Sequence, residues 1–214
     1  GVGVDGTDIS GVYYNPATMT LHPGTAIQAG FVAVGLDLAY ESNDGKITEN
    51  GQYNTQAIPH GYISHQLTDS MWIGLAMTVP FGMGTEYDDN WPLAYKGISA
   101  EVLTFDFNPN VAWKVSDKLS LGAGMSIQYA AADLKMGMGN GVTSEIDADS
   151  MAWGFNVGLM WSPLENLRFG LSYRSRINHN ADGDLEVTKP EMGVTTLDAT
   201  ATISTPAWAM ATAA

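Results

Sequence analysis

Large apolar residues alternate with small or polar ones along much of the chain, and the pattern is clearest in its third quarter. From Met151 to Trp161 the odd positions are large and apolar, whereas the even positions are mostly small or polar. A period of two predicts a β-strand with one apolar face, here long enough to cross a bilayer at a tilt. After a break at residues 162–166 the alternation resumes from Leu167 to Tyr173. The pattern therefore predicts a hairpin with one apolar and one polar face.

The same alternation predicts about eight antiparallel strands in all. They occupy residues 25–40, 54–67, 71–79, 98–115, 119–129, 151–161, 167–176 and 197–204. Residues 1–24 do not alternate and are predicted to form a separate N-terminal segment, followed by a strand region over residues 25–214. The remaining stretches, including residues 135–147 and 179–194, are predicted to be loops.

The predicted connections alternate in length. Those after the first, third, fifth and seventh strands are long, whereas those after the second, fourth and sixth are short. Long loops at one end and tight turns at the other are typical of outer-membrane barrels, whereas a soluble sandwich has no reason to sort its loops. Trp153 and Trp161 lie near opposite ends of one apolar stripe, as in an aromatic girdle. The sequence therefore favours a transmembrane β-barrel over a soluble β-protein.

Composition agrees with a membrane barrel and excludes several other classes. Charged residues make up 15% of the chain, below the roughly 25% that is usual in soluble domains. The formal charge of −14 argues against nucleic acid as a partner, and the absence of cysteine excludes disulfides. Acidic residues gather in the predicted loops, where they solvate the surface or, as the alternative, bind a divalent cation. These are Asp88 and Asp89, Asp147 and Asp149, and Asp182 and Asp184.

Enzymatic chemistry has no recognisable motif in this sequence. No Gly-x-Ser-x-Gly elbow or Walker motif occurs, so we predict no catalytic residues and no cofactor. His60 and His65 would face opposite sides of a regular strand, and no metal site is predicted.

Four stretches, in order along the chain, resemble one known family. They are Tyr14-Asn15-Pro16-Ala17-Thr18-Met19, Pro80-Phe81-Gly82 with Trp91, Asn108-Pro109 with Ala112-Trp113-Lys114-Val115, and Gly170-Leu171-Ser172-Tyr173-Arg174-Ser175. Together they make the sequence similar to the FadL family of outer-membrane transporters for long-chain fatty acids and other hydrophobic compounds, including the toluene-transport proteins. The stretch from Tyr14 to Met19 resembles the family's hatch motif, and the stretch at Pro80 resembles the end of its third strand.

The resemblance implies an all-β, antiparallel transmembrane barrel with an N-terminal luminal hatch. Since members have roughly 14 strands, the chain is expected to be a fragment of a longer gene. The alternative, a closed barrel of about eight strands, would fill its lumen with side chains and leave no room for a hatch. The implied function is passive uptake of a fatty acid or aromatic hydrocarbon by a monomer in the outer membrane of a Gram-negative bacterium. Lateral release into membrane lipid would follow. A structural or adhesive barrel and a soluble lipid-binding β-protein are the alternatives.

The resemblance also names candidate gating residues. Asn15, Pro16 and Ala17 are expected inside the concave face of the sheet, near the second and third strands. Pro80 cannot donate to a strand ladder, so the third strand is expected to pull away from its neighbour around Pro80, Phe81 and Gly82.

Candidate ligand contacts come from charge and flexibility. A fatty-acid carboxylate buried in an apolar pocket needs a cation. Arg174, and next Arg176, lie on the polar face of the seventh predicted strand, which is expected to face the lumen. The alternative is that these arginines pair with luminal acids such as Asp106. Met136 and Met138 either offer flexible apolar contacts to the ligand or pack locally.

Overall fold

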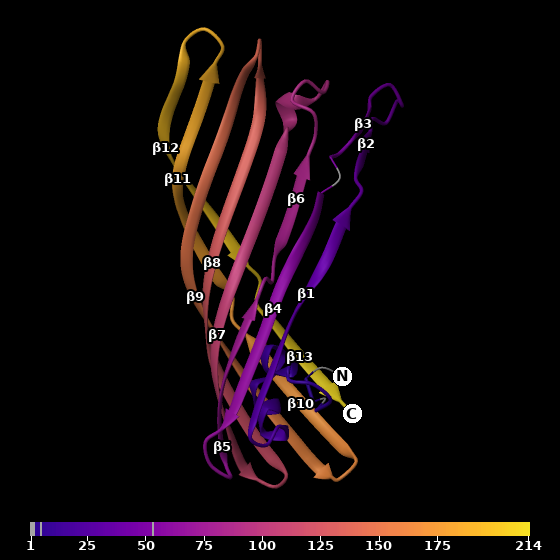
Figure 1. Ribbon diagram of the computed structural model, residues 1–214, viewed down its shortest axis with the longest axis vertical. Coiled ribbons are helices and arrows are strands. Elements are labelled where there is room, and N and C mark those ends of the chain that lie inside the picture. The colour runs from indigo at the N-terminus through magenta and orange to yellow at the C-terminus, as the bar shows by residue number, and fades with distance from the viewer. Residues whose placement is uncertain (1–2, 5, 53) are drawn as a thin grey trace.

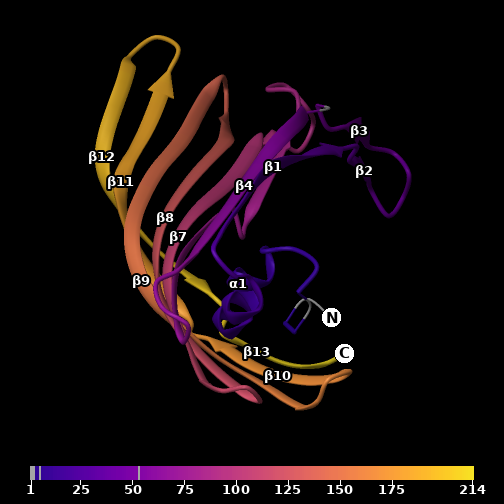
Figure 2. The same cartoon turned by 60° about the horizontal axis from the view of Figure 1, so that its bottom comes forward.

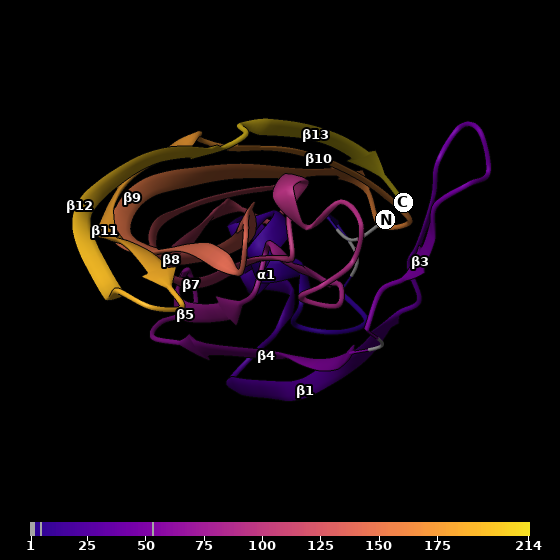
Figure 3. The ribbon, with the colours of Figure 1, turned by 90° about the horizontal axis from the view of Figure 1, so that it is seen from above.

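The computed structural model describes residues 3–4, 6–52 and 54–214. An 11-stranded antiparallel sheet curls into an open trough, and a separate two-stranded sheet projects from one rim (Figure 1). The main neighbours run in the order β1-β4-β5-β7-β8-β9-β10-β13; β6 pairs with β7, and β11 pairs with β9 and β12. The fold is therefore the predicted antiparallel barrel wall, left open along one side (Figure 3).

The elements have the following bounds. The strands of the main sheet are β1 (Thr25–Leu36), β4 (Asn54–Gln66), β5 (Met71–Thr78), β6 (Gly82–Glu86), β7 (Ser99–Ser116), β8 (Leu119–Gly139), β9 (Val142–Leu164), β10 (Leu167–Arg174), β11 (Ile177–Lys189), β12 (Gly193–Thr205) and β13 (Trp208–Ala213). The small sheet is β2 (Ala39–Glu41) with β3 (Thr48–Asn50), and the helical turns are α1 (Gly11–Tyr14), η1 (Pro16–Leu21) and η2 (Ala94–Lys96).

The N-terminal helical turns lie inside the trough, against its concave face (Figure 2). Apolar side chains from these turns pack on the wall and form the buried core. One cluster contains Val12, Met19, Trp72, Ala76 and Ala112, and a second contains Val4, Ala17 and Met160. Among the described residues, no helix is long and apolar enough to cross a membrane.

The inward and outward faces agree with the sequence prediction. In the β8–β9 pair Leu121 lies opposite Leu159, and Gly122 lies opposite Gly158. Leu121 and Val157 point outward and are exposed, whereas a Cβ on Gly122 or Gly158 would meet the helical turns inside. The apolar face is therefore the convex one, as a lipid-facing surface requires.

Two predicted loops are strand in the structure, so those predictions were wrong. Residues 135–147 are mostly the upper ends of β8 and β9, and residues 179–194 are mostly β11 and the start of β12. The ladder continues there although the outward side chains have become charged, as at Asp133 opposite Asp147. Period-two patterning of apolar residues fades in such a region, whereas backbone pairing does not depend on it.

The seventh predicted strand is also interrupted, and this changes the position of Arg176. β10 ends at Arg174, and Ser175 and Arg176 separate it from β11. Arg174 is buried, whereas Arg176 is exposed and alternates with the exposed Asn178. The prediction that both arginines point into the lumen was wrong for Arg176, because the break reverses the alternation.

We expect Val157→Arg to destabilise the complete barrel by about 2–4 kcal/mol, the cost of a cation on a lipid face near the bilayer midplane. Val157 is 44% exposed on the convex surface of β9. Val194→Arg, also exposed but at the upper end of β12, is the matched control and should be near neutral. Urea unfolding in lipid vesicles measures both. Equal losses would mean that the membrane does not cover the belt around Val157.

Candidate functional site

Asn15 fixes the N-terminal segment inside the trough. Its side chain is fully buried, and its Nδ2 donates to the carbonyl oxygens of Gly3 (2.9 Å) and Leu159 (3.0 Å). Its Oδ1 accepts from the backbone N–H of Ala17 (3.1 Å), which caps the turn that Pro16 opens. One side chain therefore satisfies the turn's free N–H and ties the segment to β9.

Two wall glycines make this close approach possible. A Cβ on Gly122 would lie 2.6 Å from the carbonyl carbon of Pro16, and one on Gly158 would lie 2.9 Å from Cγ of Asn15. The Asn15–Ala17 segment thus lies on the concave face, as predicted. It sits on β8 and β9, however, and not beside the second and third predicted strands, so that part of the prediction was wrong. Other parts of the N-terminal segment do reach β5: Met19 fills the space above Gly74, and Val12 packs with Trp72 and Ala76.

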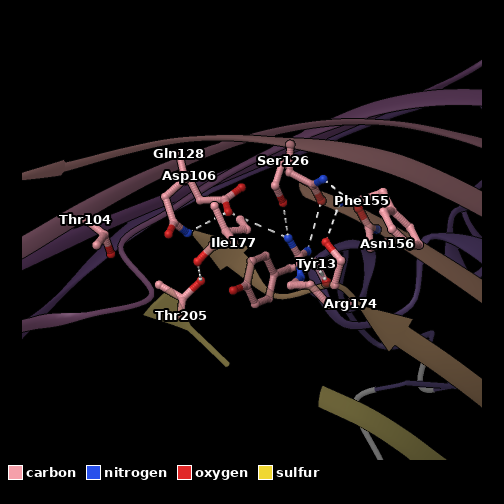
Figure 4. Close-up of polar contacts among 12 residues, drawn as sticks. Tyr13, Thr104, Asp106, Ser126, Gln128, Phe155, Asn156, Arg174, Ile177 and Thr205 are labelled. Carbon is pink, nitrogen blue, oxygen red and sulfur yellow. Dashed lines mark hydrogen bonds and ion pairs between the residues drawn. The ribbon is translucent and has the colours of Figure 1, made fainter. Parts of the chain in front are cut away.

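Arg174 joins the wall to the N-terminal segment (Figure 4). Its Nη2 donates to the carbonyl oxygen of Tyr13 (2.8 Å) and to Oδ1 of Asn108 (3.1 Å), and its Nη1 donates to Oγ of Ser126. The guanidinium carbon lies 4.1 Å from the centre of the Tyr13 ring. Its Nη1 is 3.7 Å from Oδ2 of Asp106, so the alternative of an Arg174–Asp106 pair is confirmed.

A buried polar network continues along the wall from this ion pair. Gln128 donates to Asp106 (3.1 Å) and contacts Nε2 of His179 (2.9 Å), whose Nδ1 contacts Oγ of Ser150 (2.8 Å). These links join β7, β8, β9 and β11 at one level. Sequence reasoning missed Gln128 and His179 as network members, because each is a single polar residue at an inward position and its partners lie in other strands.

The Tyr13 phenol lies at the boundary between the N-terminal segment and the wall. Burial raises the pKa of Tyr13, and the neighbouring Arg174 guanidinium opposes that rise. Tyr13 is therefore a neutral hydroxyl at physiological pH, and its ring remains an acceptor for the Arg174 cation.

The third predicted strand breaks where the sequence predicts it. β5 and β6 both pair with β7, but only β5 pairs with β4, through residues 61–66. The upper half of β4, residues 54–60, pairs with β1 and has no ladder to β6 in the described sheet. The wall is therefore discontinuous beside Pro80, Phe81 and Gly82.

A cavity of about 510 Å³, which we call the luminal cavity, connects the N-terminal segment with this discontinuity. Its lining includes Tyr13 and Tyr14 from α1, Pro80 and Phe81 from the break, Arg174, and Ile58 and His60 from β4. The structure thus brings together three of the predicted site residues, Pro80, Phe81 and Arg174. Met136 and Met138 lie near the upper end of β8 and do not line this cavity, nor does Arg176.

Comparisons with known proteins agree with this geometry. Residues 1–213 match the family described as outer membrane protein transport protein (OMPP1/FadL/TodX). The long-chain fatty acid transport protein of Escherichia coli O6:H1 is 22% identical over 86% of this chain and 48% of its own length. Outer membrane protein P1 of Haemophilus influenzae is 26% identical over 63% of this chain and 37% of its own length. The chain thus spans about half the length of the curated relatives it matches, or less.

Solved structures share the fold. A FadL homologue from Pseudomonas aeruginosa superposes with a TM-score of 0.76 at 19% identity, covering 97% of this chain and 60% of that one. The toluene transporter TbuX of Ralstonia pickettii gives a TM-score of 0.75 at 17% identity, over 97% and 63%. The relatives are outer-membrane proteins of Gram-negative bacteria, and this chain is a protein of the same membrane. The chain belongs to the outer-membrane transport-protein family OMPP1/FadL/TodX.

Proposed function

We propose that the complete protein is a passive channel for hydrophobic small molecules, such as a fatty acid or an aromatic hydrocarbon. The names of the similar proteins support this class: one is a long-chain fatty acid transport protein and another is a toluene transporter. No bond is made or broken in this function, and no energy source is needed. The ligand is driven by its own transfer from water to lipid.

The observation that carries the proposal is the luminal cavity, which joins the N-terminal segment to the broken strand. In the proposed route the Asn15–Ala17 segment acts as a hatch on the concave face. A ligand enters the luminal cavity, and movement of the hatch lets it pass the break at Pro80–Gly82 into the bilayer. Ile58 lines both the luminal cavity and a second cavity on the far side of the break, which supports a lateral path.

The role of Arg174 distinguishes two versions of the proposal. In the first, the guanidinium receives a ligand carboxylate, as the sequence predicts. In the second, it holds the hatch, and the ligand meets only neutral groups. The contacts to Tyr13, Asn108, Ser126 and Asp106 favour the second, because a carboxylate would have to displace acceptors already in place. Arg174 as a ligand contact therefore remains a prediction, and we propose the hatch-holding role.

Tethering the hatch to the wall is expected to abolish uptake. Thr20 Oγ1 and Ser120 Oγ are 2.8 Å apart and join η1 to β8. The chain has no cysteine, so Thr20→Cys with Ser120→Cys introduces the only thiol pair in these 214 residues. Oxidation of this variant in the complete protein should stop uptake of a radiolabelled hydrophobic tracer, and reduction should restore it.

The matched control is Asn178→Cys with Ser204→Cys. These side chains are 2.9 Å apart, but they join two strands that are already paired, on the convex face. Their oxidation should leave uptake unchanged. Full uptake by the oxidised Thr20–Ser120 variant would refute hatch gating.

A further inference from the structure

A second cavity, of about 200 Å³, lies at the discontinuity between β4 and β6, and we call it the exit cleft. One side is formed by apolar residues of β1 and β4, including Val34, Leu36 and Ile58. The other side is formed by β6, β7 and β8, including Gly84, Glu101 and Asp133. Since Ile58 also lines the luminal cavity, the exit cleft lies at the outer end of the proposed route.

The charges on the exit cleft all have one sign. Its lining contains the carboxylates Glu86, Glu101 and Asp133, and among the described residues no Lys or Arg lines it. Lys135 is on the same strand as Asp133, but its Nζ is paired with Asp89 at 3.0 Å. A ligand passing through the cleft therefore meets mostly apolar side chains on one side, with Gln56 among them, and carboxylates on the other.

The position of these carboxylates is fixed by the sheet. Glu101 lies opposite Asp133 in the β7–β8 ladder, and its Oε1 accepts from Nε2 of Gln56 across the discontinuity (3.2 Å). The row continues sideways over adjacent strands, with Asp133 opposite Asp147 and Asp147 opposite Asp184. Carboxylates held at one level on neighbouring strands add their fields and repel an approaching anion.

At the inner end of the route, the terminal nitrogens of Arg174 already have partners, and its Nε is buried out of reach of the lumen. Its two terminal nitrogens are engaged by Tyr13, Asn108, Ser126 and Asp106. A ligand carboxylate would therefore leave water, find both terminal nitrogens of the luminal arginine engaged, and then pass Glu101 and Asp133. Each step disfavours the ionised ligand relative to a neutral one of the same length.

We propose that the exit cleft selects uncharged hydrophobic ligands over anionic ones, with Glu101 and Asp133 as the specificity-determining residues. The inference rests on the proposed channel function and names its substrate class: hydrocarbons, long-chain alcohols and protonated acids pass, whereas ionised fatty acids are held back. It assigns a role to two residues that the hatch and the broken strand do not use.

The test compares 1-dodecanol with dodecanoate at pH 8.5, because they share a chain length and differ in charge. Initial uptake rates are measured in cells that produce the complete protein and lack other transporters of this family. The unmodified protein should take up the alcohol at least about tenfold faster. The double variant Glu101→Gln, Asp133→Asn should raise dodecanoate uptake about tenfold, as loss of ~1.4 kcal/mol of repulsion would, and leave dodecanol uptake unchanged.

Glu186→Gln with Glu191→Gln is the matched control, since these exposed carboxylates belong to the β11–β12 hairpin, lie outside the row that Asp147 and Asp184 continue, and do not line the cleft. It should not alter the ratio of the two rates. Heat-modifiable migration in detergent gels checks that each variant folds. If the double variant does not fold, Glu101→Gln alone, which can retain the hydrogen bond to Gln56, takes its place.

The outcomes separate the two proposals. If the unmodified protein takes up neither ligand, the channel function fails. If it takes up both at the same rate, or if removing the cleft carboxylates leaves the ratio unchanged, the channel function stands and charge selection at the cleft is refuted.

Discussion

Replacing Arg174 by Met should destabilise the complete barrel by about 3–5 kcal/mol, the cost of leaving a buried partner charge uncompensated. Asp106 is fully buried beside the guanidinium, and loss of the cation leaves its carboxylate with only neutral hydrogen-bond donors, Gln128 and Ser126, among the described residues. The hatch would also lose the hydrogen bond to the Tyr13 carbonyl. Urea unfolding gives the loss of stability, and limited proteolysis of the N-terminal segment reports release of the hatch.

Two comparisons sharpen this test. Arg174→Met with Asp106→Leu removes both charges and should recover much of the lost stability, because the unpaired buried charge is gone. Arg168→Met is the control, since among the residues that the structure describes its guanidinium makes one long contact, 3.5 Å from Nη1 to the carbonyl oxygen of Val4. Should Arg174→Met keep full stability and weaken only fatty-acid binding, Arg174 reads the ligand head group and the hatch-holding role is wrong.

Substituting Gly122 by Ala is expected to displace the hatch from its contact with β8. The added Cβ would lie 2.6 Å from the Pro16 carbonyl carbon, and backbone at that position cannot rotate away as a side-chain end could. Overpacking of this kind costs typically 1–3 kcal/mol, and here displacement of the segment relieves it. The expected result is a higher single-channel conductance in planar bilayers and faster proteolysis near Asn15.

Gly61→Ala is the control for this substitution, because the nearest atom to a Cβ on Gly61 lies 3.8 Å away, an ordinary contact. It should change neither conductance nor proteolysis. Gly158→Ala should behave like Gly122→Ala, since its Cβ would press on the buried Asn15 side chain. If the hatch keeps its position in both variants, the wall strands move to accommodate the added methyl groups instead.

The lower half of the wall was predictable from the sequence, whereas the upper ends of β8 and β9 and most of β11 were not. Between Met151 and Tyr173 one face meets lipid-like surroundings and the other meets the hatch, so the alternation is strong and the register follows from it. Above this level, around Asp133 and Asp147, both faces tolerate polar residues, and apolar periodicity no longer marks the strands. Strand pairing there depends on backbone hydrogen bonds. A side-chain pattern reveals a strand only where its two faces have different surroundings.

The site was predictable in part for a similar reason. Asn15, Pro16 and Pro80 constrain the backbone locally, so their positions at a turn and a strand break could be inferred from residue type. The partners of Arg174 could not, because Tyr13, Asn108 and Ser126 are brought to it by register across several strands. Gln128 and His179 gave no signal for the same reason.

The interruption at Ser175 also acts as a phase shift along one wall strand. Asn156 of β9 pairs with Arg174 of β10, and Asp149 of β9 pairs with Asp182 of β11. The stretch 174–182 is one residue longer than the stretch 149–156 that it faces, so the chain opposite β9 contains one extra residue. Odd positions therefore point outward in β10, as at Tyr173, and inward in β11, as at Ile177. The exterior of the wall changes from apolar to polar while the sequence keeps its apolar residues on odd numbers. In this strand a single extra residue thus exchanges an apolar exterior for a polar one, and deleting it would point the apolar residues of β11 outward.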